Sequence, residues 1–404
     1  MTTTTNNEQK KLNVPNLRFK EFQGKWNMCK LGDIAIVVGG GTPDTNTSQY
    51  WNGKIQWFTP SEIGRNKYVD NSVRTISEEG LNKSSAKLLP IGTILLSSRA
   101  TVGECSINKK ECTTNQGFQS LIPKENISNE FVYYLIQTKR KDLIRKSCGS
   151  TFLEISANEV RKIVISIPTI KEQDKIANVL SLLDERIATQ NKIIEDLKKL
   201  KSAIIEKVFN GKHSEKLQLN DVGSYIRGLT YSSNDVVEHG GTIVMRSNNI
   251  INGSLLDYNN NVVFVNKQMS AEQQLQNGDV VICMANGSSS LVGKSSFYDG
   301  SCHSPITVGA FCGIYRSKEP IVKWLFQTNK YRRYIWNSLQ GGNGAIANLN
   351  GEDILNMSFS IPNATIKDTC VKMLTSVDSA LENNMSLCAL YTLQKQHLLR
   401  QMFI

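Results

Sequence analysis

The tetrapeptide Val292-Gly293-Lys294-Ser295 is the part of this sequence that comes closest to a nucleotide-binding motif, because it resembles the end of a phosphate-binding P-loop. A P-loop needs a second glycine, separated by four residues from the Gly-Lys pair. That position holds Ser288, and the nearest glycine, Gly287, is one residue too far away. The residues that follow do not predict a helix whose N-terminus could hold phosphate. The sequence therefore argues against a nucleotide site here.

Other residue patterns that carry chemistry are also missing from the sequence. The four histidines lie far apart and form no HExxH motif and no paired Cys/His spacing, so we do not expect a metal site. Cys302-His303-Ser304 places a nucleophile beside a base, but adjacent residues of a strand point to opposite faces. Gly39-Gly40-Gly41 lacks the spacing of a dinucleotide-binding loop and predicts a tight turn. We predict no catalytic residue, no metal and no cofactor in this chain.

The composition indicates a globular protein that binds a polyanion. The chain has 404 residues, which predicts two or three domains, and a formal net charge of +11. Its nine cysteines are scattered and never form a CxxC pair, which indicates the reducing environment of the cytoplasm. No run approaches the roughly 18 apolar residues of a membrane span. The polar N-terminus lacks the apolar core of a signal peptide.

The residues after Ile167-Pro168 predict one long helix that ends near Asn210-Gly211. Its apolar residues recur at alternating steps of four and three, and two polar residues fill the gaps. This spacing places a single narrow apolar seam on the helix, as in coiled coils. The predicted seam consists of Ile176, Leu180, Leu183, Ile187, Gln190, Ile194, Leu197, Lys201, Ile204 and Val208.

The same helix occurs a second time at the end of the sequence. Pro168 corresponds to Pro362, an offset of 362 − 168 = 194, and this offset continues through the helix without a gap. Both polar interruptions of the seam recur in register, and such residues fix register and partner choice. We therefore predict an internal duplication whose two helices pair with each other. The second seam consists of Cys370, Leu374, Val377, Leu381, Asn384, Cys388, Tyr391, Lys395, Leu398 and Met402.

A globular module precedes each long helix. Short predicted strands at 55–58, 91–96 and 120–123, followed by a helix over 129–146, favour a mixed α/β module. The second module repeats this order at drifting offsets, so the two modules share a scaffold but differ in surface. The predicted organisation is a flexible tail at 1–16, a first module at 17–167, a long helix at 168–212, a second module at 213–361 and a second long helix at 362–404.

Two variable modules, each followed by a long helix that starts at Ile-Pro, resemble the specificity subunit of type I restriction-modification systems, the HsdS family. The opening Pro15-Asn16-Leu17-Arg18-Phe19, with Trp26 and Leu31-Gly32-Asp33-Ile34, is similar to the start of this family. Ile167-Pro168 and the residues on to Leu183-Asp184 are similar to its central spacer. The second helix departs from the pattern, because Ala364-Thr365-Ile366-Lys367 replaces the family's Pro-x-x-Glu-Gln type of run.

The resemblance implies an α/β fold with two target recognition domains, separated and joined by an antiparallel coiled coil with pseudo-two-fold symmetry. Each domain would read one half of a bipartite sequence in double-stranded DNA. Helices of about 40 residues span roughly 60 Å and would set the gap between the halves. Two modification subunits would carry S-adenosylmethionine and methylate adenine. Restriction subunits would use ATP with magnesium, and no membrane is involved.

Candidate DNA-binding residues come from the side chains that suit phosphate or base contact. Phosphates call for Lys, Arg and small polar donors, and base edges call for Arg, Lys, Asn, Gln, Ser or Thr on loops and strand ends. In the first module we predict contacts from Thr59, Ser61, Arg99, Thr101, Asn115, Gln116 and Ser150, and in the second from Arg246, Asn248, Asn286, Lys294, Ser304 and Asn343. For phosphate contact we add Lys139, Arg140, Arg332 and Arg333.

Two other functions stay open on the sequence alone. One is a coiled-coil scaffold that binds protein and never DNA, whose behaviour on heparin or DNA would be insensitive to salt, whereas phosphate binding weakens with salt. The other is an enzyme whose active site has no recognisable motif, which a catalytic residue mapped in the purified chain would support. Each candidate DNA-binding residue has its own alternative as an ordinary solvated loop residue.

Overall fold

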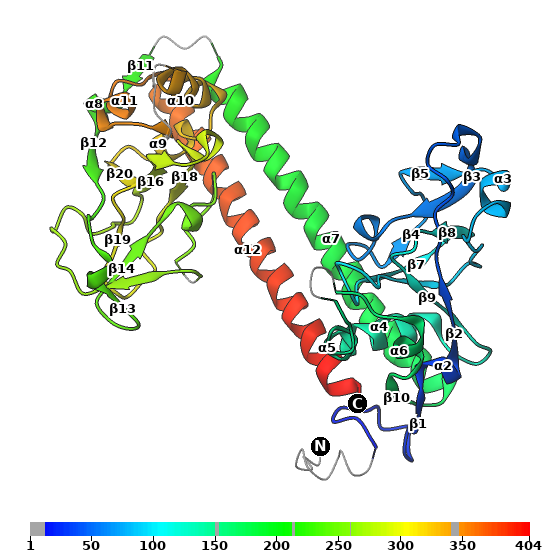
Figure 1. The fold of residues 1–404 in the computed structure, drawn as a ribbon. Helices are drawn as coiled ribbons and strands as arrows, with labels where there is room; N and C mark the ends of the chain where they lie inside the picture. The colour runs from blue at the N-terminus through cyan, green and yellow to red at the C-terminus, as the bar shows by residue number, and fades with distance from the viewer. Residues whose placement is uncertain (1–12, 150–152, 212–214, 259, 341–346) are drawn as a thin grey trace. The chain divides into compact units, whose positions relative to one another are not determined.

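The computed structural model describes residues 13–149, 153–211, 215–258, 260–340 and 347–404. The chain divides into two compact units, one formed by 1–189 with 387–404 and the other by 190–386. Two long helices, α7 (Ile170–Phe209) and α12 (Ala364–Met402), each contribute one segment to unit 1 and one to unit 2 (Figure 1). Each unit therefore consists of one globular module and two helix segments, and is described by itself.

Unit 1 contains two main sheets and the two-stranded pair of β1 with β10. Its larger sheet has the strand order β2-β9-β6-β7-β4 and its smaller sheet the order β5-β3-β8, in which β3 and β8 run parallel. The strands are β1 (Asn27–Lys30), β2 (Ala35–Gly39), β3 (Trp51–Phe58), β4 (Tyr68–Val69), β5 (Arg74–Ile76), β6 (Ile94–Leu96), β7 (Cys105–Asn108), β8 (Cys112–Thr114), β9 (Gln119–Pro123) and β10 (Val164–Ile167). The short helices are α2 (Leu31–Ile34), η1 (Ser48–Tyr50), η2 (Pro60–Glu62), α3 (Glu78–Asn82), α4 (Asn129–Thr138), α5 (Arg140–Arg145) and α6 (Ala157–Arg161).

Strand β6 lies in the middle of the larger sheet, and its two faces pack into two different apolar clusters. Its residues Ile94, Leu95 and Leu96 form an apolar run without alternation, and all three are fully buried. Helix α4 packs against this core and buries every residue from Phe131 to Ile136. The Ser128 hydroxyl accepts a hydrogen bond from the backbone N–H of Phe131 and caps the start of α4.

The single helix predicted over 129–146 was wrong, because the chain breaks it into α4 and α5 at Lys139. That residue leaves the helical conformation, with φ −92° and ψ 4°, and caps both helices. Just before the break, the Thr138 hydroxyl donates to the carbonyl of Leu135 at 2.7 Å, a local bond that competes with helix continuation. The break places the basic residues 139–141 at the start of α5 and not within the buried helix α4.

Unit 2 repeats the architecture of unit 1. Its two main sheets have the orders β12-β20-β16-β18 and β13-β15-β14-β19, with β14 and β19 parallel, and β11 with β22 and β17 with β21 form two-stranded pairs. The strands are β11 (Glu215–Gln218), β12 (Gly223–Arg227), β13 (Val236–Val237), β14 (Thr242–Met245), β15 (Val263–Val265), β16 (Val280–Cys283), β17 (Ala285–Asn286), β18 (Ser295–Phe297), β19 (Ile306–Val308), β20 (Cys312–Ser317), β21 (Ala347–Asn348) and β22 (Ser358–Ile361). The short helices are α8 (Leu219–Val222), η3 (Ser233–Asp235), η4 (Ser247–Asn249), η5 (Ser289–Leu291), α9 (Val322–Leu325), α10 (Asn329–Gln340) and α11 (Gly351–Leu355).

The shared strand order confirms the internal duplication. β2-β9-β6-β7 corresponds to β12-β20-β16-β18, and the parallel pair β3–β8 corresponds to β14–β19. In each module the first and last strands pair antiparallel, β1 with β10 and β11 with β22. The last strand then leads through an Ile-Pro pair into the long helix, as predicted.

The two long helices run antiparallel within each unit. In unit 1, Lys395 Nζ lies 2.6 Å from Asp184 Oδ1, and Arg186 donates to the Tyr391 hydroxyl. In unit 2, Lys201 Nζ lies 2.6 Å from Asp378 Oδ1, and the amide of Gln190 donates to the side-chain oxygen of Asn384. In both units the partner number falls as the α7 number rises. The mixed α/β fold with an antiparallel helix pair is thereby confirmed.

The ion pairs of the helices follow the duplication. With the offset of 194, Asp184 corresponds to Asp378 and Lys201 to Lys395, so the two ion pairs are copies of each other. Gln190 and Asn384 are also 194 residues apart and contact each other directly. All twenty predicted seam residues are buried or half-buried, which supports the seam, although the full set of pairings stays a prediction.

A segment near the N-terminus completes unit 1. The Arg18 guanidinium forms two hydrogen bonds with the fully buried carboxylate of Glu172, at 2.7 and 2.8 Å, and the indole N–H of Trp26 donates to the same carboxylate. The Leu17 N–H donates to the carbonyl of Gln401, and Phe403 stacks on Phe131.

The same segment explains the departure in the second helix. In unit 2, α7 ends at Phe209 and β11 begins at Glu215, so among the described residues no segment equivalent to 13–26 meets the start of α12, and Ile366 stands where unit 1 has Glu172. Residues 1–12 of the predicted tail lie outside the described residues. Asn13 is packed in unit 1, where its backbone carbonyl accepts the Trp26 N–H.

Candidate nucleic-acid interface

A 3-10 turn follows the third strand of the first module and the equivalent strand of the second. In unit 1 the Glu62 carboxylate accepts hydrogen bonds from the Thr59 N–H at 2.8 Å, the Thr59 hydroxyl at 2.6 Å and the Val73 N–H at 2.7 Å. In unit 2 the Asn249 side chain accepts the Arg246 N–H at 2.9 Å. These bonds fix each turn and leave Ser61 and Asn248, both predicted DNA contacts, exposed at its surface.

Thr59, predicted to contact DNA, has its hydroxyl engaged inside the turn. We expect Thr59→Ala to lower the free energy of unfolding of unit 1 by about 1 kcal/mol, the usual cost of losing a capping side chain. Thr59→Ser keeps the hydroxyl and serves as the control. Urea unfolding of the two variants measures the difference. Equal stability of Thr59→Ala and the unchanged chain would contradict the capping role.

Three loops of unit 1 bring most of its predicted DNA-binding residues together. The Asn115 N–H donates to the carbonyl of Phe58 beside the turn, and the Ser98 N–H donates to the carbonyl of Gly117. The Gln116 side chain accepts a hydrogen bond from the Thr42 hydroxyl. The predicted residues that these loops carry are Thr59, Ser61, Arg99, Thr101, Asn115 and Gln116.

Several of these side chains already have partners within the protein. The Arg99 guanidinium lies 2.8 Å from the Glu154 carboxylate, and the pair is partly exposed. The Thr101 hydroxyl lies 3.0 Å from that of Ser97, and the Asn115 side chain accepts the Gly117 N–H at 2.9 Å. Arg99 would have to exchange Glu154 for phosphate or base, whereas Ser61 is exposed and its hydroxyl lies 3.1 Å from that of Thr59.

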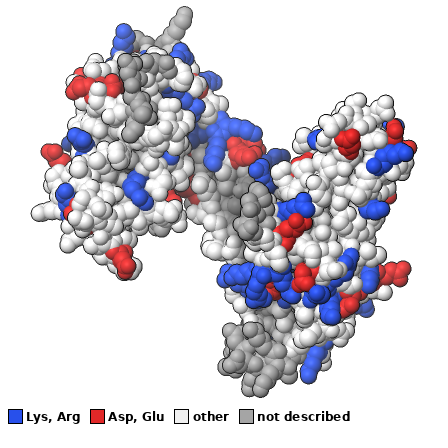
Figure 2. Space-filling model, in the orientation of Figure 1, with Lys and Arg blue, Asp and Glu red and all other residues white. Residues whose placement is uncertain are grey.

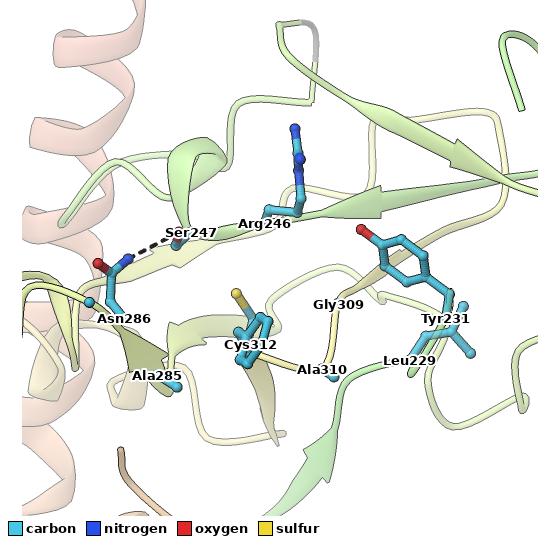
Figure 3. Close-up of a pocket in the computed structure, with 11 residues that line it drawn as sticks. Leu229, Tyr231, Arg246, Ser247, Ala285, Asn286, Gly309, Ala310 and Cys312 are labelled. Carbon is cyan, nitrogen blue, oxygen red and sulfur yellow. Dashed lines mark hydrogen bonds between the residues drawn. The ribbon is translucent and has the colours of Figure 1, made fainter. Parts of the chain in front are cut away.

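In unit 2 a cavity of about 540 Å³ lies at the equivalent place, next to the turn (Figure 3). Two predicted residues, Arg246 and Asn286, line it. The Asn286 amide donates to the Ser247 hydroxyl at 3.3 Å, and Arg246 donates to the carbonyl of Asn261 at 3.3 Å. Figure 3 shows Arg246 beside the cavity, with Tyr231 on the neighbouring segment.

Two aromatic residues of this cavity were missed by the sequence analysis. Tyr231 and Phe311 both line it, and Phe311 is 69% exposed, unusually high for a large apolar side chain. The loop Gly309-Ala310-Phe311 follows β19 as Asn115-Gln116-Gly117 follows β8. Aligning the ends of the two strands would therefore have identified Phe311 as a loop residue at the candidate surface.

The remaining predicted residues are distributed over other places. Lys294 and Arg332 line a second cavity of unit 2, of about 430 Å³, together with the 64% exposed Trp336. Ser304 and Arg333 are exposed and line neither of these two cavities of unit 2. Lys139 and Arg140 line a cavity of unit 1, and burial lowers the pKa of Lys139. Ser150 and Asn343 lie outside the described residues.

The basic charge is concentrated in one part of the unit 1 surface. Figure 2 shows Lys and Arg side chains gathered over the region where Figure 1 places α5. Residues 139–141 and Arg145 belong to this region, and Arg145 is paired with Asp142. A surface of this charge attracts polyanions over a distance that salt shortens.

The sequence patterns considered for nucleotide or metal binding do not form such sites within the described residues. The residues after Val292-Gly293-Lys294 form strand β18, as expected for a sequence that is no P-loop. Within the described ranges, no three or more His, Cys, Asp and Glu side chains gather where they could hold a metal ion. All nine cysteines are free thiols. Among the helices that the structure describes, none has the length and apolar character to cross a membrane.

Comparison with known families gives two matches along the chain. The model for the type I restriction modification DNA specificity domain matches residues 23–199 and, a second time, residues 212–387. The chain belongs to this specificity family. The resemblance inferred from the sequence is thus confirmed, and each match covers one module with most of the long helix that follows it.

Relatives of the specificity family are similar to part of this chain. A type I restriction enzyme specificity subunit of Methanocaldococcus jannaschii, MjaIX, is 40% identical over 179 residues, which is 43% of this chain and 41% of that protein. The EcoR124I/EcoR124II specificity subunit of Escherichia coli is 34% identical over 175 residues, 42% of this chain and 43% of that protein. The chain thus spans under half the length of the curated relatives it matches.

Solved structures of the specificity family share the fold over nearly the whole chain. The S subunit of a type I restriction-modification system from M. genitalium covers 97% of this chain and 99% of its own, with 16% identity and a TM-score of 0.62. A second solved structure comes from work on complex assembly and conformational transition of the type I R-M system. It covers 93% of this chain and 96% of its own, with 14% identity and a TM-score of 0.50. At these identities the likeness concerns the fold alone.

Proposed function

We propose that this chain selects the DNA sequence for a type I restriction-modification complex. Each module reads one half of a bipartite site in double-stranded DNA, and the paired helices set the gap and dock the partner subunits. The observation that carries the proposal is the duplication: the same strand order occurs twice, each copy ends in a long helix, and each copy matches the specificity domain by itself. The chain performs no catalysis of its own.

The chemistry of the complex then belongs to the partners. Two modification subunits supply S-adenosylmethionine and methylate adenine, and restriction subunits use ATP with magnesium. This chain supplies the readers on two rigid scaffolds. The loops of unit 1 and the cavity of unit 2 provide hydroxyl, amide and guanidinium groups, the types that pair with base edges and phosphates. The free cysteines fit a cytoplasmic complex.

The proposal is tested by sequencing methylated DNA. The chain is expressed with its modification subunits in a host without adenine methylation, and N6-methyladenine is mapped. Two short conserved halves around a fixed unspecified gap are the expected motif. Absent methylation, or a continuous motif, with all subunits soluble would overturn it and favour a protein scaffold.

Residue-level reading in unit 2 can be tested at its cavity. Arg246→Ala and Asn248→Ala are expected to relax or change the half-site read by unit 2 and leave the other half intact, because each lost base contact removes about 1–3 kcal/mol of discrimination. Lys318→Ala, an exposed cation of unit 2 that does not line the cavity, is the control. Methylation at an unchanged motif and rate in both variants would exclude these two residues as base readers.

A further inference from the structure

A cavity of about 670 Å³ in unit 1 lies between the junction of α4 with α5 and the last turns of α12. Its rim carries four cations, Lys139, Arg140, Lys141 and Arg400, and its lining includes no carboxylate side chain. Leu399, Phe403 and Ile404 form the apolar part of the lining, and the ring of Phe403 packs against those of Phe131 and Trp26. The cavity thus combines an apolar surface with several positively charged side chains.

Only part of this charge is neutralised within the chain. Arg140 lies 2.7 Å from the Glu104 carboxylate. Lys139 Nζ donates to the backbone oxygen of Ile404 at 2.8 Å, and burial lowers the pKa of Lys139. Arg400 donates through Nε to the carbonyl of Gln396, and neither Arg400 nor Lys141 forms an ion pair with any residue that the structure describes.

The duplication provides an internal comparison, because unit 2 contains the same two elements. With the helix offset, Arg400 corresponds to Glu206 (400 − 194 = 206). Thr138 matches Thr328, so Lys139 corresponds to Asn329 and Lys141 to Tyr331 (331 − 190 = 141). At all three positions unit 1 has a cation where unit 2 has a neutral or acidic residue.

In unit 2 the equivalent residues form contacts within the protein. The Glu206 carboxylate accepts the backbone N–H of Asn329 at 2.9 Å, which joins the end of α7 to the start of α10. Tyr331 is buried and donates its hydroxyl to the carbonyl of Gly293, and Ile205 is buried beside them. Unit 2 therefore has a carboxylate and a buried tyrosine at the positions where unit 1 has Arg400 and Lys141.

We propose that the unit 1 cavity binds an acidic segment of a partner protein. An Asp or Glu side chain of that segment takes the place that Glu206 has in unit 2, and pairs with Arg400 and Lys141. An apolar neighbour of this residue covers Leu399 and Phe403. The inference rests on the proposed function only in requiring partner subunits.

The apolar floor favours a protein segment over DNA as the occupant. Duplex DNA offers phosphates to the rim but no apolar group that would cover Leu399 and Phe403, whereas a peptide offers both groups. Salt bridges at such partly desolvated sites combine with apolar contact to fix a docking orientation. In this proposal Lys139 and Arg140 belong to the docking site rather than to the phosphate contacts.

Charge reversal at Arg400 tests the proposal. Arg400→Glu restores the residue type of unit 2 and repels an acidic segment, so binding of a purified modification or restriction subunit to the full chain should weaken at least tenfold. Lys87→Glu makes the same change of charge at an exposed position of unit 1 outside the cavity, and should have no effect. Unchanged affinity for both subunits in Arg400→Glu overturns the proposal.

A second measurement distinguishes protein from DNA and identifies the segment. If Arg400 contacts phosphate instead, Arg400→Glu lowers the affinity for a labelled target duplex and reduces the salt slope by about 1, and the protein proposal fails. Carbodiimide coupling of the assembled complex should join Lys141 to an acidic peptide of a partner, and Lys141→Gln should lose that product. A split methylation motif in the same preparations shows that the proposed function stands independently of either result.

Discussion

Replacing Asp378 by alanine is expected to lower the stability of unit 2 by about 3–5 kcal/mol, because the substitution leaves a buried ammonium without its counter-ion. The side chains of Asp378 and Lys201 are only 5% and 7% exposed, and their charged atoms lie 2.6 Å apart. Asp378 also accepts the indole N–H of Trp324 at 2.9 Å, and Lys323 lies 3.6 Å from it. Burial lowers the pKa of Lys201 in spite of this partner.

The duplicated pair in unit 1 provides the matched control. The Asp184 carboxylate accepts a hydrogen bond from the Tyr134 hydroxyl at 2.6 Å and pairs with Lys395. The side chains of Asp184 and Lys395 are 22% and 17% exposed. Water reaches this pair more easily, so Asp184→Ala should cost less than Asp378→Ala. The double substitution Lys201→Met with Asp378→Leu removes both charges and should recover most of the loss.

Hydrogen exchange during urea unfolding measures these differences, in unit 2 peptides for Asp378→Ala and in unit 1 peptides for Asp184→Ala, since the two units need not unfold in one transition. A loss below about 1 kcal/mol in Asp378→Ala, or a larger loss in Asp184→Ala, would contradict the assignment of a strongly desolvated pair to unit 2.

Exchange of residues 215–361 for the equivalent module of another specificity subunit is expected to replace one half of the methylated motif completely. These limits keep β11 and β22 together, because the two strands pair along their whole length. They also leave α7 and α12 unchanged, so the gap between the halves should keep its length. The other half, read by unit 1, should stay as it was.

The reciprocal exchange of residues 27–167 is the control, since it keeps the ladder of β1 with β10 intact and should change only the opposite half. Mapping N6-methyladenine in both chimaeras provides the readout. A change of both halves in either chimaera would mean that one site is read jointly by the two modules.

The long helices could be predicted from the sequence because local rules determine them. An Ile-Pro pair before each helix and an apolar period of four and three are properties of short stretches, and the constant offset of 194 shows that the same stretch occurs twice. The break of α4 from α5 at Lys139 was not predictable in this way. It depends on a local hydrogen bond of Thr138 and on the packing of Phe131 to Ile136 in the core.

The candidate DNA-binding surface was predicted by residue type, and its geometry depends on contacts distant in sequence. Arg99 and Glu154 are 55 positions apart, and no spacing rule indicates their ion pair. The hydroxyl of Thr59 looked available in the sequence but belongs to Glu62 in the turn. Phe311 was missed because apolar residues are usually buried, and only the fold shows its exposure.

Unit 1 is built from both ends of the sequence, and this has a consequence for the order of folding during synthesis. Its core includes Met402 and Phe403, so the first module leaves the ribosome long before the residues that complete it. The delay is 404 − 189 = 215 residues, roughly 10–40 s at 5–20 residues per second. Unit 2, continuous from 190 to 386, can fold within that interval. The unit that is synthesised first is therefore completed last, because Phe403 covers the apolar residues Trp26 and Phe131 only once α12 has been made.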